Sequence, residues 1–125
     1  MAQDVAEVVN RDSIQTIITF DKGGISGHPN HININDAIPM IHTLCPHVAI
    51  YVLKTKGFIR KYVHAVDCIF SFFERNDEKS VVTVLESNAM AAKAMTLYPS
   101  QLVWYRYIYL MFSTYTKFNQ LIELY

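Results

Sequence analysis

The alternation of hydrophobic and polar residues predicts a strand near the start of the chain and helices further along. In residues 13–20, β-branched side chains are frequent, and Ile14 and Phe20 would share one face of a strand. A turn region with three glycines follows, and the short run His31–Ile34, which contains two isoleucines, offers a second strand. We therefore predict a β-hairpin with a long connection within residues 1–34.

Helical spacing of apolar residues dominates the rest of the chain. Asp36 can cap a helix that ends near Pro46, and a second helix is expected from Pro46 to Gly57. Residues 59–75 show the clearest helical period, with an apolar stripe on one side and charged residues on the other. A further helix is expected after Asp77, with small alanines that would allow a bulky neighbour to approach closely.

The last segment, Ser100–Tyr125, contains the only tryptophan and is rich in tyrosine. Apolar and aromatic side chains point in all directions around it, so we expect a central helix that the others cover. The predicted fold class is mostly α (α+β), with one domain over residues 1–125. An N-terminal β-hairpin in residues 1–34 would precede a compact bundle of about five helices in residues 35–125, with the C-terminal aromatic helix central.

The composition changes this picture by leaving too few charges to cover the surface. Hydrophobic residues make up 51% of the chain, charged residues 18%, and the formal net charge is zero. Self-association or a protein partner would cover the surplus apolar surface, so we predict a homo-oligomer or a partner-binding subunit. Tyrosine and tryptophan are favoured at such interfaces. The predicted interface residues are Trp104, Tyr105, Tyr109 and Phe112.

The same features predict an intracellular protein, cytoplasmic or nuclear, without a transmembrane span. Residues 1–12 lack the basic start and apolar run of a signal peptide, and two cysteines give no disulfide framework. The aromatic segment is too short to span a bilayer and carries Arg106.

Four of the five histidines and one cysteine lie close together in the sequence, which makes a zinc site an alternative prediction. Two pairs of donors are separated by two residues, a spacing that can bring both donors of a pair to one Zn²⁺. The nearest carboxylate is that of Asp36, so a structural role is favoured over hydrolysis. The candidate ligands are His28, His31, His42, Cys45 and His47.

A local run of basic residues gives a second alternative, a small nucleic-acid-binding protein. No acidic residue occurs between Asp36 and Asp67, and aromatic residues are interleaved with the cations. Such a mixture can neutralise phosphates and stack bases. The candidate residues are Tyr51, Lys54, Lys56, Arg60, Lys61, Tyr62 and His64.

We find no catalytic motif in the sequence. No Walker or dinucleotide-binding pattern accompanies the glycines, and no orienting group accompanies Cys45, so no catalytic residue is assigned. The preferred prediction is a non-enzymatic, α-rich interaction or structural protein without a cofactor. Its small size and lack of motifs suggest a virus-encoded or phage-encoded accessory protein.

Overall fold

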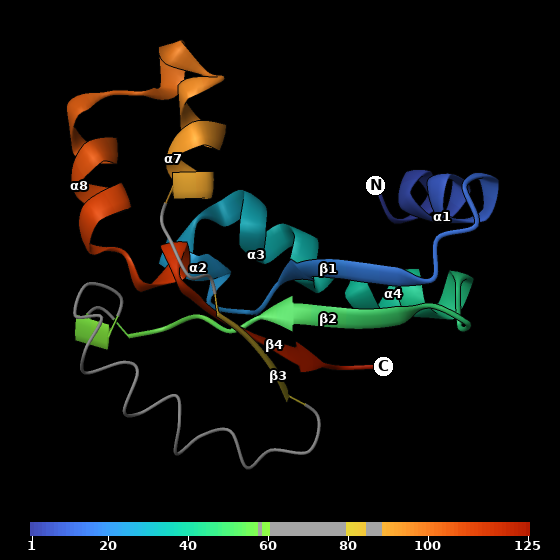
Figure 1. Ribbon diagram of the computed structural model, residues 1–125. Coiled ribbons are helices and arrows are strands. Elements are labelled where there is room, and N and C mark those ends of the chain that lie inside the picture. The colour runs from blue at the N-terminus through green and yellow to red at the C-terminus, as the bar shows by residue number, and fades with distance from the viewer. Residues whose placement is uncertain (58, 61–79, 85–88) are drawn as a thin grey trace. The chain divides into compact units, whose positions relative to one another are not determined.

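A computed structural model shows a mixed β-sheet with helices, in place of the predicted helical bundle (Figure 1). The structure describes residues 1–57, 59–60, 80–84 and 89–125. Its elements are α1 (Ala2–Arg11), β1 (Thr16–Phe20), α2 (Gly24–Gly27), α3 (Pro29–Asp36), α4 (Ile38–Leu44), β2 (Ala49–Leu53), β3 (Ser80–Val84), α7 (Ala89–Thr96), the 3₁₀ turn η2 (Pro99–Gln101), α8 (Trp104–Phe112), the 3₁₀ turn η3 (Thr114–Thr116) and β4 (Phe118–Glu123).

The chain divides into two compact units. Unit 1 consists of Met1–Thr55 with Leu121–Tyr125, and unit 2 consists of Lys56–Gln120. The hydrogen-bonded order of the strands is β1-β2-β4-β3, and β4 runs from unit 2 into unit 1. The prediction of one domain over residues 1–125 stays a prediction.

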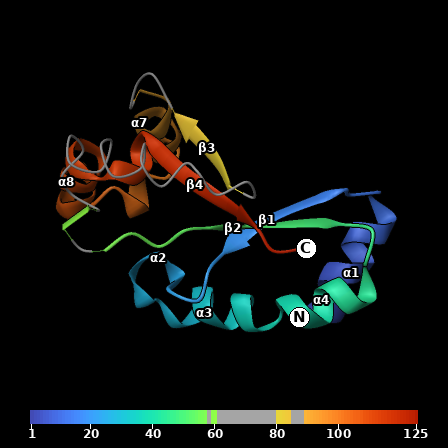
Figure 2. The ribbon, with the colours of Figure 1, turned by 90° about the horizontal axis from the view of Figure 1, so that it is seen from below.

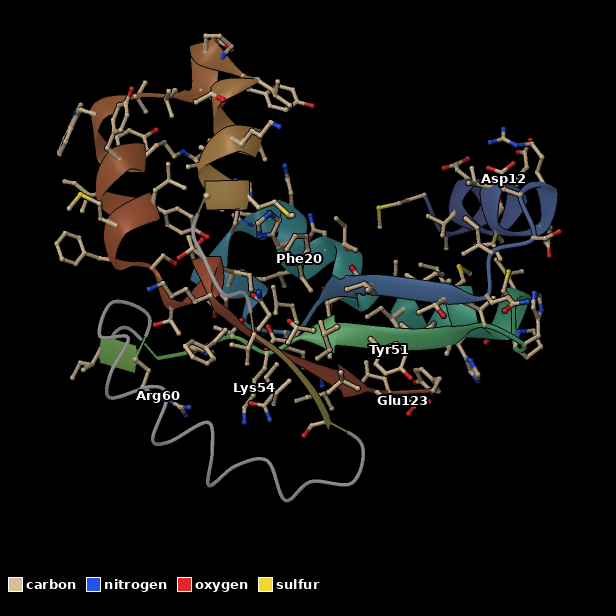
Figure 3. All side chains as sticks on the ribbon, viewed as in Figure 1. Asp12, Phe20, Tyr51, Lys54, Arg60 and Glu123 are labelled. Carbon is tan, nitrogen blue, oxygen red and sulfur yellow. The ribbon has the colours of Figure 1, made fainter. Side chains whose placement is uncertain are left out.

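In unit 1, β2 lies between β1 and the end of β4. The β1 and β2 strands are parallel, with Thr16 opposite Ala49 and Phe20 opposite Leu53. On the other edge of β2 the pairing is antiparallel, with Tyr51 opposite Glu123 (Figure 3). Because β1 and β2 run in the same direction, their carboxyl ends meet at one edge of the sheet.

One face of these strands is covered by α1, α3 and α4 (Figure 2). The side chains of Ile50 and Val52 alternate inward from β2 and form a buried cluster with Ile38 and Ile41 of α4. A neighbouring buried cluster contains Ala6 and Val9 of α1 with Cys45 and Val48. The core of unit 1 therefore holds α4 and α1 against the strands by apolar burial.

The burial of Ile50 in this core predicts the effect of a conservative substitution. Ile50 is 1% exposed, and the substitution Ile50→Val removes one buried methylene group. We expect this variant to lose about 1 kcal/mol of unfolding free energy, measured by urea denaturation. Ile18→Val is the matched control on β1, because Ile18 is 63% exposed. Equal losses in the two variants would contradict the burial of Ile50.

The described part of unit 2 has a markedly polar interior. The backbone N–H of Lys56 donates to the hydroxyl of Tyr115 at 2.6 Å, and its ammonium group donates to the carbonyl of Phe118 at 3.3 Å. The hydroxyl of Thr114 donates to the carbonyl of Arg60 at 2.7 Å. Since Lys56, Thr114 and Tyr115 are all buried, these hydrogen bonds compensate for the loss of hydration.

The predicted N-terminal β-hairpin is wrong. Residues His31–Ile34 belong to α3, and the partner of β1 is β2. Pro29 occupies the first turn of α3, and the imidazole of His28 accepts a hydrogen bond from the N–H of Asn30. These start signals favour a helix over the two-isoleucine strand.

The predicted helical bundle is also wrong. The expected helix from Pro46 to Gly57 contains β2, and the expected helix after Asp77 is replaced by β3 followed by α7. The run Ala49–Leu53 is short and fits a strand with both faces partly covered, a pattern that periodicity alone does not separate from a buried helix. Most of the predicted helix 59–75 lies outside the described residues.

The C-terminal aromatic helix is neither as long nor as central as predicted. The α8 helix ends at Phe112 and has no buried residue, and the chain continues into η3 and β4. Hydroxyl side chains favour this break, because Thr116 donates to the carbonyl of Ser113 and so competes with helical hydrogen bonding. Within the described residues, no helix is both long and apolar enough to cross a membrane.

Candidate functional site

The candidate site lies where the two parallel strands of unit 1 end. Asp21 follows β1 directly, and Thr55 comes two residues after the end of β2. Pockets in α/β proteins form preferentially outside the carboxyl ends of parallel strands, because the loops that leave the strands diverge there. The segment that follows β1 leads to the sequence GHPNH, in which His28 directly precedes α3 and His31 lies in the first turn of that helix.

A hydrogen-bond network between Asp21 and Thr55 joins the two strand ends. The carboxylate of Asp21 accepts from the backbone N–H of Thr55 at 2.6 Å and from the N–H of Gly23 at 3.0 Å. It also accepts from the hydroxyl of Thr55, and that hydroxyl accepts in turn from the N–H of Ile25 at 2.9 Å. The network fixes the segment that follows β1, and that leads to His28, against the end of β2.

The glycines of this loop allow its close approach to neighbouring residues. A Cβ atom on Gly23 would lie 2.6 Å from the Cβ of Thr55, and one on Gly24 would lie 3.1 Å from the Cβ of His31. Gly24 also has a positive φ of 56°, and Ile25 has a φ of 66°, which is rare for a β-branched residue. Backbone strain of this kind costs about 1–3 kcal/mol and is concentrated at functional sites.

His31 is held by a hydrogen bond and by ring stacking. Its Nδ1 lies 3.0 Å from the carbonyl oxygen of Gly24, and its ring stacks on Phe20 with centroids 3.9 Å apart. Phe20 is the last residue of β1 (Figure 3). A carbonyl oxygen only accepts, so Nδ1 carries the proton, and Nε2 of the neutral ring presents a lone pair.

His28 makes the opposite kind of hydrogen bond. Its Nδ1 accepts from the backbone N–H of Asn30 at 3.3 Å, so in the neutral ring the proton is on Nε2. The rings of His28 and His31 have centroids 4.9 Å apart. The pair thus places an N–H group and a lone pair close together at the start of α3.

The α3 helix that carries His31 is tied to the same strand end. Asn35 is 7% exposed, and its side-chain amide donates to the carbonyl of Phe20 at 2.9 Å. His31 therefore lies on a helix that is hydrogen-bonded to β1 and is stacked on the last residue of that strand.

The structure separates the five predicted zinc ligands. His28 and His31 lie together, His42 stacks on Tyr125, and Cys45 is fully buried in the apolar cluster with α1. His47 is exposed and precedes β2, at the opposite end of that strand from Thr55. Among the described residues, no group of three or more His, Cys, Asp or Glu side chains is arranged to hold a metal ion. Zinc binding stays a prediction.

The basic segment does not form a continuous cationic surface in the described residues. The ammonium group of Lys56 is turned inward to the carbonyl of Phe118 and lies 5.8 Å from the ring centroid of Tyr115. Lys54 and Tyr51 are half-buried. The remaining candidates are Arg60, which is half-buried, and Lys61, Tyr62 and His64, which lie outside the described residues.

The predicted interface residues lie on α8. Trp104, Tyr105 and Phe112 are exposed, and Tyr109 is half-buried. Their role as an interface stays a prediction.

Sequence reasoning did not identify Asp21, Thr55 or Phe20 as site residues. The signal available was an aspartate directly after a predicted strand, followed by a glycine-rich loop with histidines. This signal does not predict a site without the parallel pairing of β1 and β2, which brings Thr55 to Asp21 across 34 residues of sequence.

Comparison with curated proteins shows what the chain is similar to. It is 34% identical over 116 residues to a Bos taurus protein named "N-acetylglucosaminyl-phosphatidylinositol de-N-acetylase", an alignment that covers 90% of this chain and 46% of the relative. It is 34% identical over 126 residues to a Schizosaccharomyces pombe protein named "Probable N-acetylglucosaminyl-phosphatidylinositol de-N-acetylase", covering 97% of this chain and 51% of the relative. A Dictyostelium discoideum protein of that second name is 26% identical over 151 residues, covering 96% of this chain and 58% of the relative. No family model and no solved structure matches the chain.

These similarities overturn the function predicted from the sequence. The chain spans about half the length of the curated relatives it matches, and those relatives are named as enzymes. The prediction of a non-enzymatic interaction protein from a virus or phage is therefore wrong, and so is the alternative of a nucleic-acid-binding protein. The relatives that the chain resembles are named as de-N-acetylases of N-acetylglucosaminyl-phosphatidylinositol.

Proposed function

We propose that this chain carries the histidine-bearing part of the active site of a de-N-acetylase that acts on N-acetylglucosaminyl-phosphatidylinositol. The observation that carries the proposal is the pairing of His28 and His31, with opposite hydrogen-bonding states, beside the last residue of β1. The names of the curated relatives supply the reaction and the substrate.

Removal of the acetyl group is the hydrolysis of an amide. The oxygen of water bonds to the acetyl carbonyl carbon, the bond from that carbon to the sugar nitrogen breaks, and the products are acetate and a free amine. The sugar nitrogen must gain a proton as it leaves, and the attacking water must lose one. A site for this reaction needs a proton donor and a lone pair within reach of one another.

The two histidines meet these needs in different roles. His28 presents Nε2–H, which can donate a hydrogen bond to the acetyl oxygen as negative charge develops on it. His31 presents the lone pair of Nε2, which can accept a proton from water and then deliver it to the leaving nitrogen. Its Nδ1–H is held by the carbonyl of Gly24, so the ring keeps its orientation while Nε2 reacts.

Asp21 is a positioning residue in this proposal. Its carboxylate already accepts three hydrogen bonds, from Gly23 and from the N–H and hydroxyl of Thr55. These bonds hold the segment that leads to His28 and His31 against the end of β2. A catalytic group is kept in productive geometry when its surroundings are fixed in this way.

The described residues fit a zinc site only in part. A carbonyl partner on the second ring nitrogen is the usual support for a metal-bound imidazole, and His31 has it. A catalytic zinc site uses about three protein ligands, however, and no such group is present among the described residues. We therefore derive no catalytic step through zinc. Zinc binding by His31 is an alternative to its role as a base, because its single Nε2 lone pair cannot bind a metal and accept a proton from water at the same time.

Zinc binding has a direct test. We expect His31→Ala to weaken zinc binding by more than about tenfold, because it removes the imidazole whose orientation is fixed by Gly24. His47→Ala is the matched control, since His47 is exposed at the other end of β2. Equilibrium dialysis followed by metal analysis gives the two affinities. Equal affinities in both variants would contradict a zinc donor at His31.

The proposed function is tested by incubating the protein with N-acetylglucosaminyl-phosphatidylinositol in detergent micelles and measuring acetate and free amine together. We expect the two products in equal amounts, and no product from the double variant His28→Ala/His31→Ala. Absence of acetate release by the unmodified protein, or equal release by the double variant, would overturn the proposal.

A further inference from the structure

In an ordinary surface helix the charged side chains face water and the apolar side chains face the protein. The α8 helix has the reverse arrangement. At about 100° per residue, Arg106, Tyr109 and Leu110 share one side, and these three are half-buried. Every other residue of the helix is exposed. We call these residues the outward face of α8: Trp104, Tyr105, Tyr107, Ile108, Met111 and Phe112.

The charge on α8 is on the covered side of the helix. The guanidinium of Arg106 lies 5.8 Å from the ring centroid of Tyr105, and its Nε is buried without a hydrogen-bond partner among the described residues. A helix in contact with water places its charged groups outward and its apolar groups inward. The outward face of α8 is therefore suited to an apolar or interfacial environment.

The segment before α8 has the same character. The α7 helix has no buried residue, and Met90, Leu97 and Tyr98 are 73%, 72% and 65% exposed. Exposed apolar side chains on neighbouring segments are typical of docking surfaces, because isolated soluble domains rarely leave large apolar patches open to water.

The charges in residues 89–122 indicate which kind of partner surface this region can bind. From residue 89 to residue 122 the sequence contains no acidic residue, and with Arg106 on the covered side of α8 the exposed cation of the two helices is Lys93. Anionic phospholipid headgroups attract such a segment, and tryptophan and tyrosine are enriched at the depth of the headgroups. Exposed apolar groups and aromatic rings, in a segment without acidic residues, are features of helices that bind membrane surfaces.

We infer that α7 and α8 dock on the surface of a bilayer that contains anionic phospholipid, with the outward face of α8 entering the headgroup region. The nine residues of α8 extend over about 14 Å, less than half the thickness of a hydrocarbon core, so the helix lies in the interface. The choice of phosphatidylinositol as the anionic lipid rests on the proposed function, because the named substrate of the relatives carries it.

The chain contains its own reporter for this inference, because Trp104 is the only tryptophan and lies on the outward face of α8. The full chain is titrated with vesicles of phosphatidylcholine, with and without phosphatidylinositol. We expect the emission of Trp104 to shift to shorter wavelength, and brominated lipid to quench it, with tighter binding to the anionic vesicles.

The variant Ile108→Asp/Met111→Asp should weaken vesicle binding by about tenfold or more, because it places carboxylates on the inserting face. Both side chains are exposed, so circular dichroism and thermal unfolding should remain as in the unmodified protein. Met40→Asp is the matched control on α4, since Met40 is 60% exposed and Met111 is 67% exposed. The control should bind vesicles as tightly as the unmodified protein.

Two results would overturn the inference. One is an emission spectrum that vesicles do not change. The other is an emission already shifted to shorter wavelength without lipid and dependent on protein concentration, which would mean that a second copy covers the face. Vesicle binding is measured without turnover, whereas acetate release can be measured on a lipid-free headgroup. A failure of docking is thereby distinguished from a failure of the proposed activity.

Discussion

Replacement of His31 by alanine is expected to lower the rate of acetate release by a factor of about 10²–10⁴, the usual contribution of a positioned acid or base. The substitution removes the Nε2 lone pair that the carbonyl of Gly24 holds in place. It also removes the stacking on Phe20. The rate is measured at saturating substrate in micelles, with folding verified by circular dichroism.

Two further variants separate the chemical role of His31 from its structural role. His31→Asn keeps a side-chain N–H that can donate to the carbonyl of Gly24, yet it lacks the atom that corresponds to Nε2. We expect it to unfold like the unmodified protein and to be as inactive as His31→Ala. The control His47→Ala should retain full activity, because His47 lies at the other end of β2. Full activity in His31→Asn would contradict the assigned role of Nε2.

Replacement of Asp21 by alanine is expected to lower the free energy of unfolding by about 3 kcal/mol, since three donors at the strand ends lose their acceptor at about 1 kcal/mol each. The donors are the N–H of Gly23 and the N–H and hydroxyl of Thr55. Activity should fall as well, because the loop that carries His28 and His31 starts from this network. Urea denaturation gives the free energy, and acetate release gives the rate.

The matched control for this variant is Asp36→Ala. Asp36 is an exposed carboxylate at the end of α3, so its removal should change the unfolding free energy by less than about 0.5 kcal/mol. Thr55→Ser keeps both the N–H and a hydroxyl, and should therefore lose much less stability than Asp21→Ala. A loss in Asp21→Ala no larger than in Asp36→Ala would show that the network does not hold the two strand ends.

The candidate site was only partly visible in the sequence. The short spacing of His28 and His31 predicted that the two side chains lie close together, and the structure places their ring centroids 4.9 Å apart. The prediction also grouped them with His42, Cys45 and His47, because these residues are near in sequence. The fold separates these three side chains from His28 and His31. One strand, β2, lies between His47 and Thr55, so residues close in sequence reach opposite ends of it.

The aromatic segment shows how composition misleads about burial. Its tyrosines, tryptophan and single arginine were expected to form a central helix, since apolar side chains are usually buried. The structure gives a short helix without a buried residue, while the following residues 113–116 are buried despite their hydroxyl groups. Hydrogen bonds such as that from the hydroxyl of Thr114 to the carbonyl of Arg60 compensate for the hydration that these polar groups lose on burial.

By itself, the sequence determined the elements that local signals specify. The β-branched run predicted the strand that is found as β1, and the proline positions around residues 38–44 predicted the helix that is found as α4. Only the tertiary structure decided that Ala49–Leu53 is a strand, that it pairs in parallel with β1, and that Asp21 meets Thr55. A five-residue apolar run satisfies a strand or a buried helix equally well, and the choice comes from hydrogen-bond partners more than thirty residues away, which no local pattern records.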